Sequence, residues 1–152
     1  RNSSINSNIQ KTIESGSDIN AMGGFCNRTC LIDAVQNDCM MDIKLLIRLK
    51  ADLNAKDSEG QTALIWAIKE CRVDIARVLI EKGADLNSSN IHGWTSLIKA
   101  VELGNKDIVM LLIEKGADLN VRAKDGSSAL MKAIHIREKD IAKLLIKKRG
   151  QI

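Results

Sequence analysis

The stretch from residue 93 to residue 100 reads Gly-Trp-Thr-Ser-Leu-Ile-Lys-Ala, and close copies of it recur at a constant interval of 33 residues. The copies are Gly-Gln-Thr-Ala-Leu-Ile-Trp-Ala at 60–67, Gly-Ser-Ser-Ala-Leu-Met-Lys-Ala at 126–133 and Asn-Arg-Thr-Cys-Leu-Ile-Asp-Ala at 27–34. Thr or Ser, Leu and Ala keep their places in all of them. A unit of this length that repeats without a gap builds one small structural module several times and stacks the copies.

Each copy predicts a helix, a reversal and a second helix. The polar segment 57–62 contains Gly60, which is a turn signal, and the hydroxyl of Thr62 can cap the first turn of a helix. Apolar residues at spacings of three and four then mark one helix face, and a second apolar run begins at Val73. This run ends at Gly83, a residue type that can take the left-handed conformation that terminates a helix.

The unit resembles the ankyrin repeat, which opens with Gly-x-Thr-Pro-Leu-His-x-Ala and closes with Gly-Ala-Asp-x-Asn, as residues 116–120 do here. The resemblance runs from about Ile5 to the end of the chain. It implies an all-α ankyrin-repeat solenoid of stacked helix-turn-helix units with β-turn fingers. We therefore expect residues 1–152 to form a single ankyrin-repeat domain. Its predicted parts are a partial N-terminal repeat at 5–21 and full repeats at 22–54, 55–87, 88–120 and 121–152.

The chain departs from the family pattern at recurring positions. The usual Pro is replaced by Cys30, Ala63, Ser96 and Ala129, and the usual His by Ile32, Ile65, Ile98 and Met131. Hydrogen bonding between Thr and His is therefore unavailable, and we expect apolar contact to replace it. Lys50 and Arg149 stand where other repeats have a terminating Gly, and a side chain in a left-handed conformation costs about 1–2 kcal/mol.

Composition narrows the function classes. Apolar residues make up 45% of the 152 residues and aromatics 2%, and the net charge of +4 is modest for a dedicated nucleic-acid binder. No apolar run reaches the roughly 18 residues of a membrane helix. The cysteines Cys26, Cys30, Cys39 and Cys71 lack the spacing of a zinc site, so we expect reduced thiols and no bound metal. We expect a cytoplasmic or otherwise intracellular monomer without a cofactor.

The sequence offers no group of residues suited to catalysis. His92 and His135 are 43 residues apart in different repeats, and neither has a Ser or Cys partner placed by the repeat. Asp52, Asp85 and Asp118 occupy one repeat position, which favours a role as turn formers. We therefore predict that the protein is not an enzyme and has no catalytic residues.

The aromatic residues indicate where a partner would bind. Phe25, Trp66 and Trp94 fall on turn or first-helix positions. The family resemblance implies that partners bind along a concave groove made by these same elements. Asp33 and Lys99 occupy the Trp66 position in other repeats, so we expect that position to be partly exposed. Register also predicts that Trp66 and Trp94 are neighbours. The alternative interpretation is that the two indoles only seal adjacent turns.

The sequence thus predicts a non-catalytic protein–protein interaction scaffold, with a weak indication of acidic character in its partner. The expected partner-binding residues are Trp66, Lys69, Glu70, Ile91, His92, Trp94, Lys99, Glu102, Leu103, Lys132 and His135. A second hypothesis is that the repeats are the targeting arm of a larger enzyme, channel or effector, because the sequence starts at Arg1 rather than Met. The basic run 147–149 could contact nucleic acid, but attraction to a helix C-terminus explains it more simply.

Overall fold

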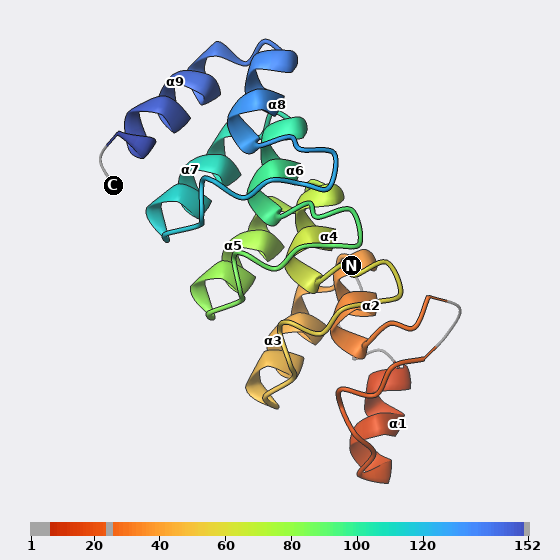
Figure 1. Cartoon of the computed structure of the whole chain (residues 1–152). Coiled ribbons are helices and arrows are strands. Elements are labelled where there is room, and N and C mark those ends of the chain that lie inside the picture. The colour runs from red at the N-terminus through yellow and green to blue at the C-terminus, as the bar shows by residue number, and fades with distance from the viewer. Residues whose placement is uncertain (1–6, 24–25, 151–152) are drawn as a thin grey trace. The chain divides into compact units, whose positions relative to one another are not determined.

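The computed structural model describes residues 7–23 and 26–150, and it folds them into helices without any strand (Figure 1). The helices are α1 (Ser7–Ser15), α2 (Cys30–Gln36), α3 (Met40–Arg48), α4 (Ala63–Lys69), α5 (Val73–Glu81), α6 (Ser96–Glu102), α7 (Lys106–Glu114), α8 (Ala129–His135) and α9 (Lys139–Arg149). The all-α prediction is therefore confirmed for these residues. Phe25 lies outside the described residues.

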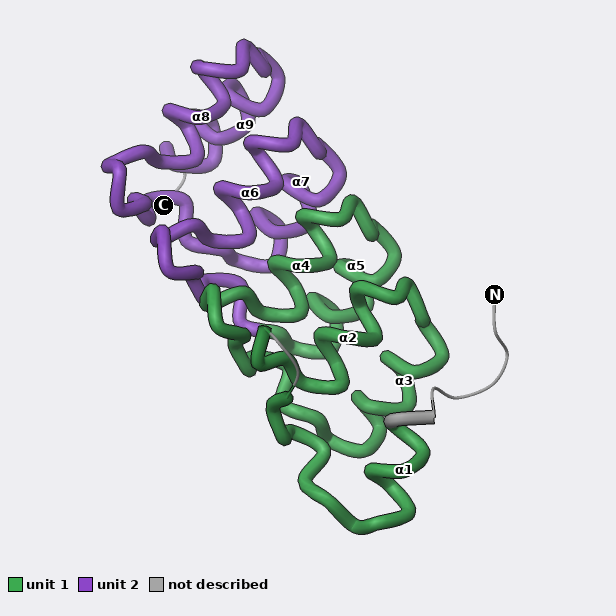
Figure 2. The backbone as a smooth tube through the Cα atoms, turned by 90° about the vertical axis from the view of Figure 1, so that its right-hand side faces the viewer, with its two compact units in different colours: residues 1–84 green, residues 85–152 purple. Residues whose placement is uncertain are grey.

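The chain divides into two compact units, residues 1–84 and residues 85–152 (Figure 2). In unit 1, α2 packs against both α3 and α4, and α4 packs against α5. In unit 2, α6 packs against both α7 and α8, and α8 packs against α9. Each unit is thus a stack of helical hairpins, as the repeat predicts, while the residue limits of the repeats stay predictions.

Every first helix of the hairpins begins at a capping hydroxyl. The side chains of Thr29, Thr62, Thr95 and Ser128 accept hydrogen bonds from the backbone N–H three residues on, at 3.2–3.3 Å. These bonds satisfy donors that the first turn of a helix leaves open. The three Thr residues are each 2% exposed, so the caps are also part of the core.

The core is built from the positions that recur with the repeat. Leu31, Leu64 and Leu97 are each 1% exposed, and small Ala residues let the helices approach closely. The isoleucines at the family's usual His position, Ile32, Ile65 and Ile98, are likewise 1% exposed. Apolar burial therefore takes the place of the family's usual Thr–His hydrogen bonding in these repeats, as expected. Met131 at the same position is 49% exposed.

The turns that close the repeats have the predicted chemistry. Asp18, Asp52, Asp85 and Asp118 each accept a hydrogen bond on Oδ1 from the backbone N–H of the Asn two residues later, at 2.9 Å. The Asn side chains link successive turns, because Asn20 accepts from the N–H of Asp52 and Asn87 from the N–H of Asp118. In unit 2 the turn fingers are closed by bridges between Ser89 and Thr95 and between Arg122 and Ser128.

The two residues predicted to strain a helix end behave differently. Lys50 has a φ of 64°, which confirms the expected left-handed conformation. The expectation for Arg149 is wrong, because α9 continues through Arg149 and ends at Gly150 with a φ of −70°. The basic last turn of α9 is regular helix.

Candidate functional site

Unit 2 carries an aromatic ring held by two lysines from successive repeats. Trp94 lies in the turn finger just before the cap of α6, and its indole is half-buried. Lys99 of α6 and Lys132 of α8 each place Nζ 4.7 Å from the centroid of the ring. Lys99 Nζ also lies 2.9 Å from Glu102 Oε2, and Lys132 Nζ lies 3.8 Å from Asp125 Oδ2. We call these five residues the Trp94 cluster.

Three kinds of interaction fix the orientation of the Trp94 ring. A lysine over an indole is worth about 0.5–2 kcal/mol depending on desolvation, and both lysine side chains are only 19% exposed. The two carboxylates hold the ammonium groups in place, and the packing of α8 on α6 brings Lys132 to the ring. The result is an aromatic side chain presented at the surface with little freedom left to lose on binding.

Exposed apolar side chains occur on the same elements as the Trp94 cluster. Ile91 in the finger is 48% exposed, Leu103 at the end of α6 is 42% exposed and Met131 on α8 is 49% exposed. Arg122 bonds the carbonyl of Gly126 at 3.0 Å and places Nη1 3.7 Å from the sulfur of Met131. The turn tips and first helices of unit 2 therefore offer apolar area together with fixed charge.

Trp66 in unit 1 has a different environment, and the expectation of a partly exposed position is wrong. Its side chain is 8% exposed, and its Nε1 donates to Asp57 Oδ2 at 2.7 Å. Asp57 is itself 7% exposed and accepts the backbone N–H groups of Glu59 and Gln61 on its other oxygen. The indole is drawn inward because this buried carboxylate satisfies its single polar group.

Cations also lie over the buried Trp66 ring. Lys69 Nζ is 4.5 Å and Arg28 Cζ 5.4 Å from its centroid. Arg28 and Trp66 are 38 residues apart, as are Trp94 and Lys132, so both pairs occupy the same two repeat positions. The cation comes first in one pair, and the aromatic residue comes first in the other. Burial raises the pKa of Asp33 near this site, and the attraction of Arg28 only partly offsets that rise.

Comparison with known proteins agrees with this geometry. A family model described as ankyrin repeats (3 copies) matches residues 2–90 and 87–152. The chain belongs to the ankyrin-repeat family. No curated protein matches the sequence. Ankyrin repeats are in general protein–protein interaction modules and are typically not catalytic.

Among the described residues, no helix has the length and apolar character needed to cross a membrane. Within the same residues, no group of three or more His, Cys, Asp or Glu side chains is placed to hold a metal ion.

The predicted binding residues are distributed over both ankyrin units. Lys69 and Glu70 are exposed at the end of α4, His92 is exposed in a finger, and His135 is exposed at the end of α8. The structure brings Lys99, Glu102 and Lys132 together with Trp94. Trp66 and Trp94 belong to different units, and their predicted adjacency stays a prediction.

Sequence reasoning missed the charged residues that complete these sites. Asp57, Asp125, Arg122 and Arg28 were not among the expected site residues, because they vary between repeats and so carry no periodic signal. The available signal was the 38-residue pairing of a finger position with a first-helix position. Applied to each Trp in turn, this pairing would have found Arg28 for Trp66 and Lys132 for Trp94.

Asp125, one of the two carboxylates of the Trp94 cluster, has a lowered pKa, and the cause of this shift can be tested. The Ser127 hydroxyl and backbone N–H both donate to Asp125, and with a smaller contribution from Lys132 they lower the pKa of this carboxyl. Stability from a lowered pKa is present above the ordinary carboxyl pKa and is lost as pH falls toward the folded value. We expect Ser127→Ala to raise the Asp125 pKa toward its ordinary value, measured by NMR titration of its side-chain carbon.

A matched variant separates the hydrogen bond from the ion pair in this titration. Lys132→Gln removes only the weaker attraction and should raise the Asp125 pKa less than Ser127→Ala does. A larger rise in the Lys132 variant would show that the ion pair, and not the hydroxyl, controls the carboxylate.

Proposed function

We propose that the chain is a non-catalytic scaffold that binds a protein partner along the turn tips and first helices of its ankyrin repeats. The observation that carries the proposal is Trp94, a half-buried indole held by Lys99 and Lys132 in a turn finger. Truncating a Trp at an interface often costs about 2 kcal/mol or more, because it fills a pocket with a large and rigid surface.

The surroundings of Trp94 support contact with a partner. Ile91 and Leu103 supply exposed apolar area, and burial of such area drives most protein association. Lys99 and Lys132 already have carboxylate partners, so we infer that their role is orientation and specificity more than net affinity. His92 is exposed in the finger that carries Trp94, and His135 is exposed at the end of α8, so both are available to contact a partner. In unit 1, Lys69 and Glu70 are the exposed candidates.

The experiment that tests this proposal measures partner binding. The immobilised protein captures partners from native lysate, and the affinity of the recovered partner is then measured for each variant. We expect Trp94→Ala to weaken binding about 30-fold or more. Met110→Ala is the matched control, because Met110 is 40% exposed on α7, a second helix. Equal affinity of the wild-type protein and the Trp94 variant would place the binding site elsewhere.

A further inference from the structure

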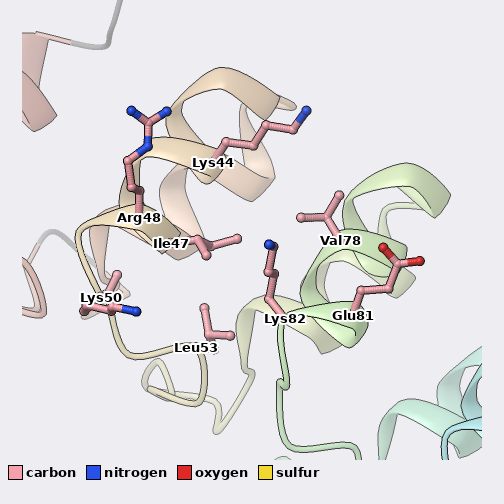
Figure 3. Close-up of a pocket in the computed structure, with 9 residues that line it drawn as sticks. Lys44, Ile47, Arg48, Lys50, Leu53, Val78, Glu81 and Lys82 are labelled. Atoms are coloured by element: carbon pink, nitrogen blue, oxygen red, sulfur yellow. The ribbon is translucent and has the colours of Figure 1, made fainter.

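A second candidate site lies in unit 1, on elements that the proposed function does not use. A cavity of about 670 Å3 is lined by α3, the loop after it and α5 (Figure 3). Ile47, Leu53 and Val78 extend toward its centre and form an apolar floor (Figure 3). All three are partly exposed, so the floor is in contact with solvent. Such a floor can accept an apolar side chain from another molecule.

The rim of this cavity is strongly basic. Lys44, Arg48, Lys50 and Lys82 line it with a single carboxylate, Glu81, and all of these residues are exposed. In the described part of the chain, no ion pair or hydrogen bond joins the side chains of these four cations to another residue. Lys44 and Arg48 are also four residues apart on one helix, an arrangement in which like charges repel. The residues that the structure describes therefore leave this excess positive charge without ion-pair partners.

The scaffold does not require this charge. The residues at the equivalent positions one repeat further along the sequence carry no excess charge. They include two cations, Arg77 and Lys115, and two carboxylates, Glu81 and Glu114. Lys50 is replaced there by Gly83, which takes a positive φ without the side-chain strain that Lys50 carries at a φ of 64°. The α3–α5 cavity thus combines unneutralised charge with a lysine in an unfavourable backbone conformation.

From this charge and the apolar floor, we infer that the α3–α5 cavity binds an acidic peptide segment of a protein partner that also carries an aliphatic side chain. The aliphatic group would occupy the floor between Ile47 and Val78, and carboxylates would pair with the rim cations. The aliphatic part of the Lys82 side chain extends over the floor, and its ammonium group can pair with a carboxylate of the peptide (Figure 3). The partner's negative charge would also steer its approach.

The distribution of the cations favours a peptide over a single small anion. Lys44 and Arg48 lie along α3, Lys50 follows the end of that helix, and Lys82 comes from the end of α5 (Figure 3). The charged ends of these side chains lie apart from one another, whereas a bound phosphate would need them to converge on one point (Figure 3). An extended chain with carboxylates on both sides of an aliphatic residue matches this arrangement.

The test uses the full chain and an acetylated peptide that alternates Glu with Leu, with binding measured by calorimetry. We expect the double variant K44Q/R48Q to weaken binding by about tenfold, which corresponds to the loss of two partly exposed ion pairs. The matched control is K143Q/K147Q on α9, because these exposed lysines occupy the equivalent repeat positions and the net charge changes equally. This control should bind like the wild-type protein.

Two comparisons decide between occupants. The same peptide with Ser in place of Leu should bind more weakly, since it cannot fill the floor. The binding of phosphatidylserine vesicles and of duplex DNA should be weakened no more by K44Q/R48Q than by K143Q/K147Q. The inference is overturned if both double variants weaken peptide binding equally, if the Ser peptide binds as well as the Leu peptide, or if only vesicles or DNA respond to K44Q/R48Q. Circular dichroism of both double variants confirms that the helices are retained.

Discussion

Replacing Trp66 with Ala should destabilise the protein by about 3–5 kcal/mol, the cost of removing a large side chain from a packed interior. Trp66 is 8% exposed, and its loss would leave a cavity on α4. It would also leave Asp57 without its 2.7 Å partner, so that a buried carboxylate oxygen loses its hydrogen bond. Urea unfolding followed by circular dichroism measures the change.

Trp94→Ala is the comparison for this result. Trp94 is half-buried and donates no hydrogen bond to a buried carboxylate, so we expect a smaller loss of about 1–2 kcal/mol. The stability of Trp66→Phe should fall between those of the wild-type protein and Trp66→Ala, because an aromatic ring still fills part of the space but the indole N–H donor is lost. If the two Ala variants were equally stable, Trp66 would not have the structural role that its burial indicates.

A methyl group added at Gly93 should destabilise unit 2 by about 3 kcal/mol or more, from strain and overlap together. Gly93 has a φ of 77°, and a Cβ built there would lie 2.9 Å from the backbone N of Lys124 and 3.1 Å from Cα of Ala123. The Lys124 N–H donates to the carbonyl of His92, so relief of the overlap would disturb a bond between two fingers. Thermal unfolding of Gly93→Ala measures this loss.

Gly126 provides a control at the equivalent position of the next finger. Its φ is 82°, and a Cβ there would have no atom within 4 Å. Gly126→Ala should therefore cost only the conformational strain, about 1–2 kcal/mol. Equal losses in the two variants would mean that the approach of the fingers at Gly93 contributes nothing to stability.

Much of the fold could be predicted because its determinants act over a few residues. Thr62 caps a helix through an N–H three residues away, and Asp85 closes a turn through an N–H two residues away. The 33-residue interval then showed that each local solution recurs, which is sufficient to predict stacked helical hairpins. The end of α9 was mispredicted because the local signal at residue 149 differs from that of the other repeats.

The candidate site was less predictable for a physical reason. Trp66, Lys99 and Lys132 occupy the same repeat position, so the 33-residue period predicts the same degree of exposure for all three. The structure places Trp66 inside, because Asp57 is available to accept its N–H, and places Lys99 and Lys132 around the ring of Trp94. Whether a variable side chain is buried depends on what it meets, and those partners differ from one repeat to the next.

The sequence by itself determined the helices, their caps and the turns between them, since backbone preferences and short-range hydrogen bonds are encoded within each repeat. Only the tertiary structure decided which indole is buried and which cations have no ion-pair partner among the described residues. It also decided that α3 and α5 leave an apolar floor between their basic residues. These properties depend on which side chains meet in the folded protein, as Trp66 meets Asp57 and Trp94 meets Lys132. The energies of such contacts depend on burial and distance that exist only after the helices have packed.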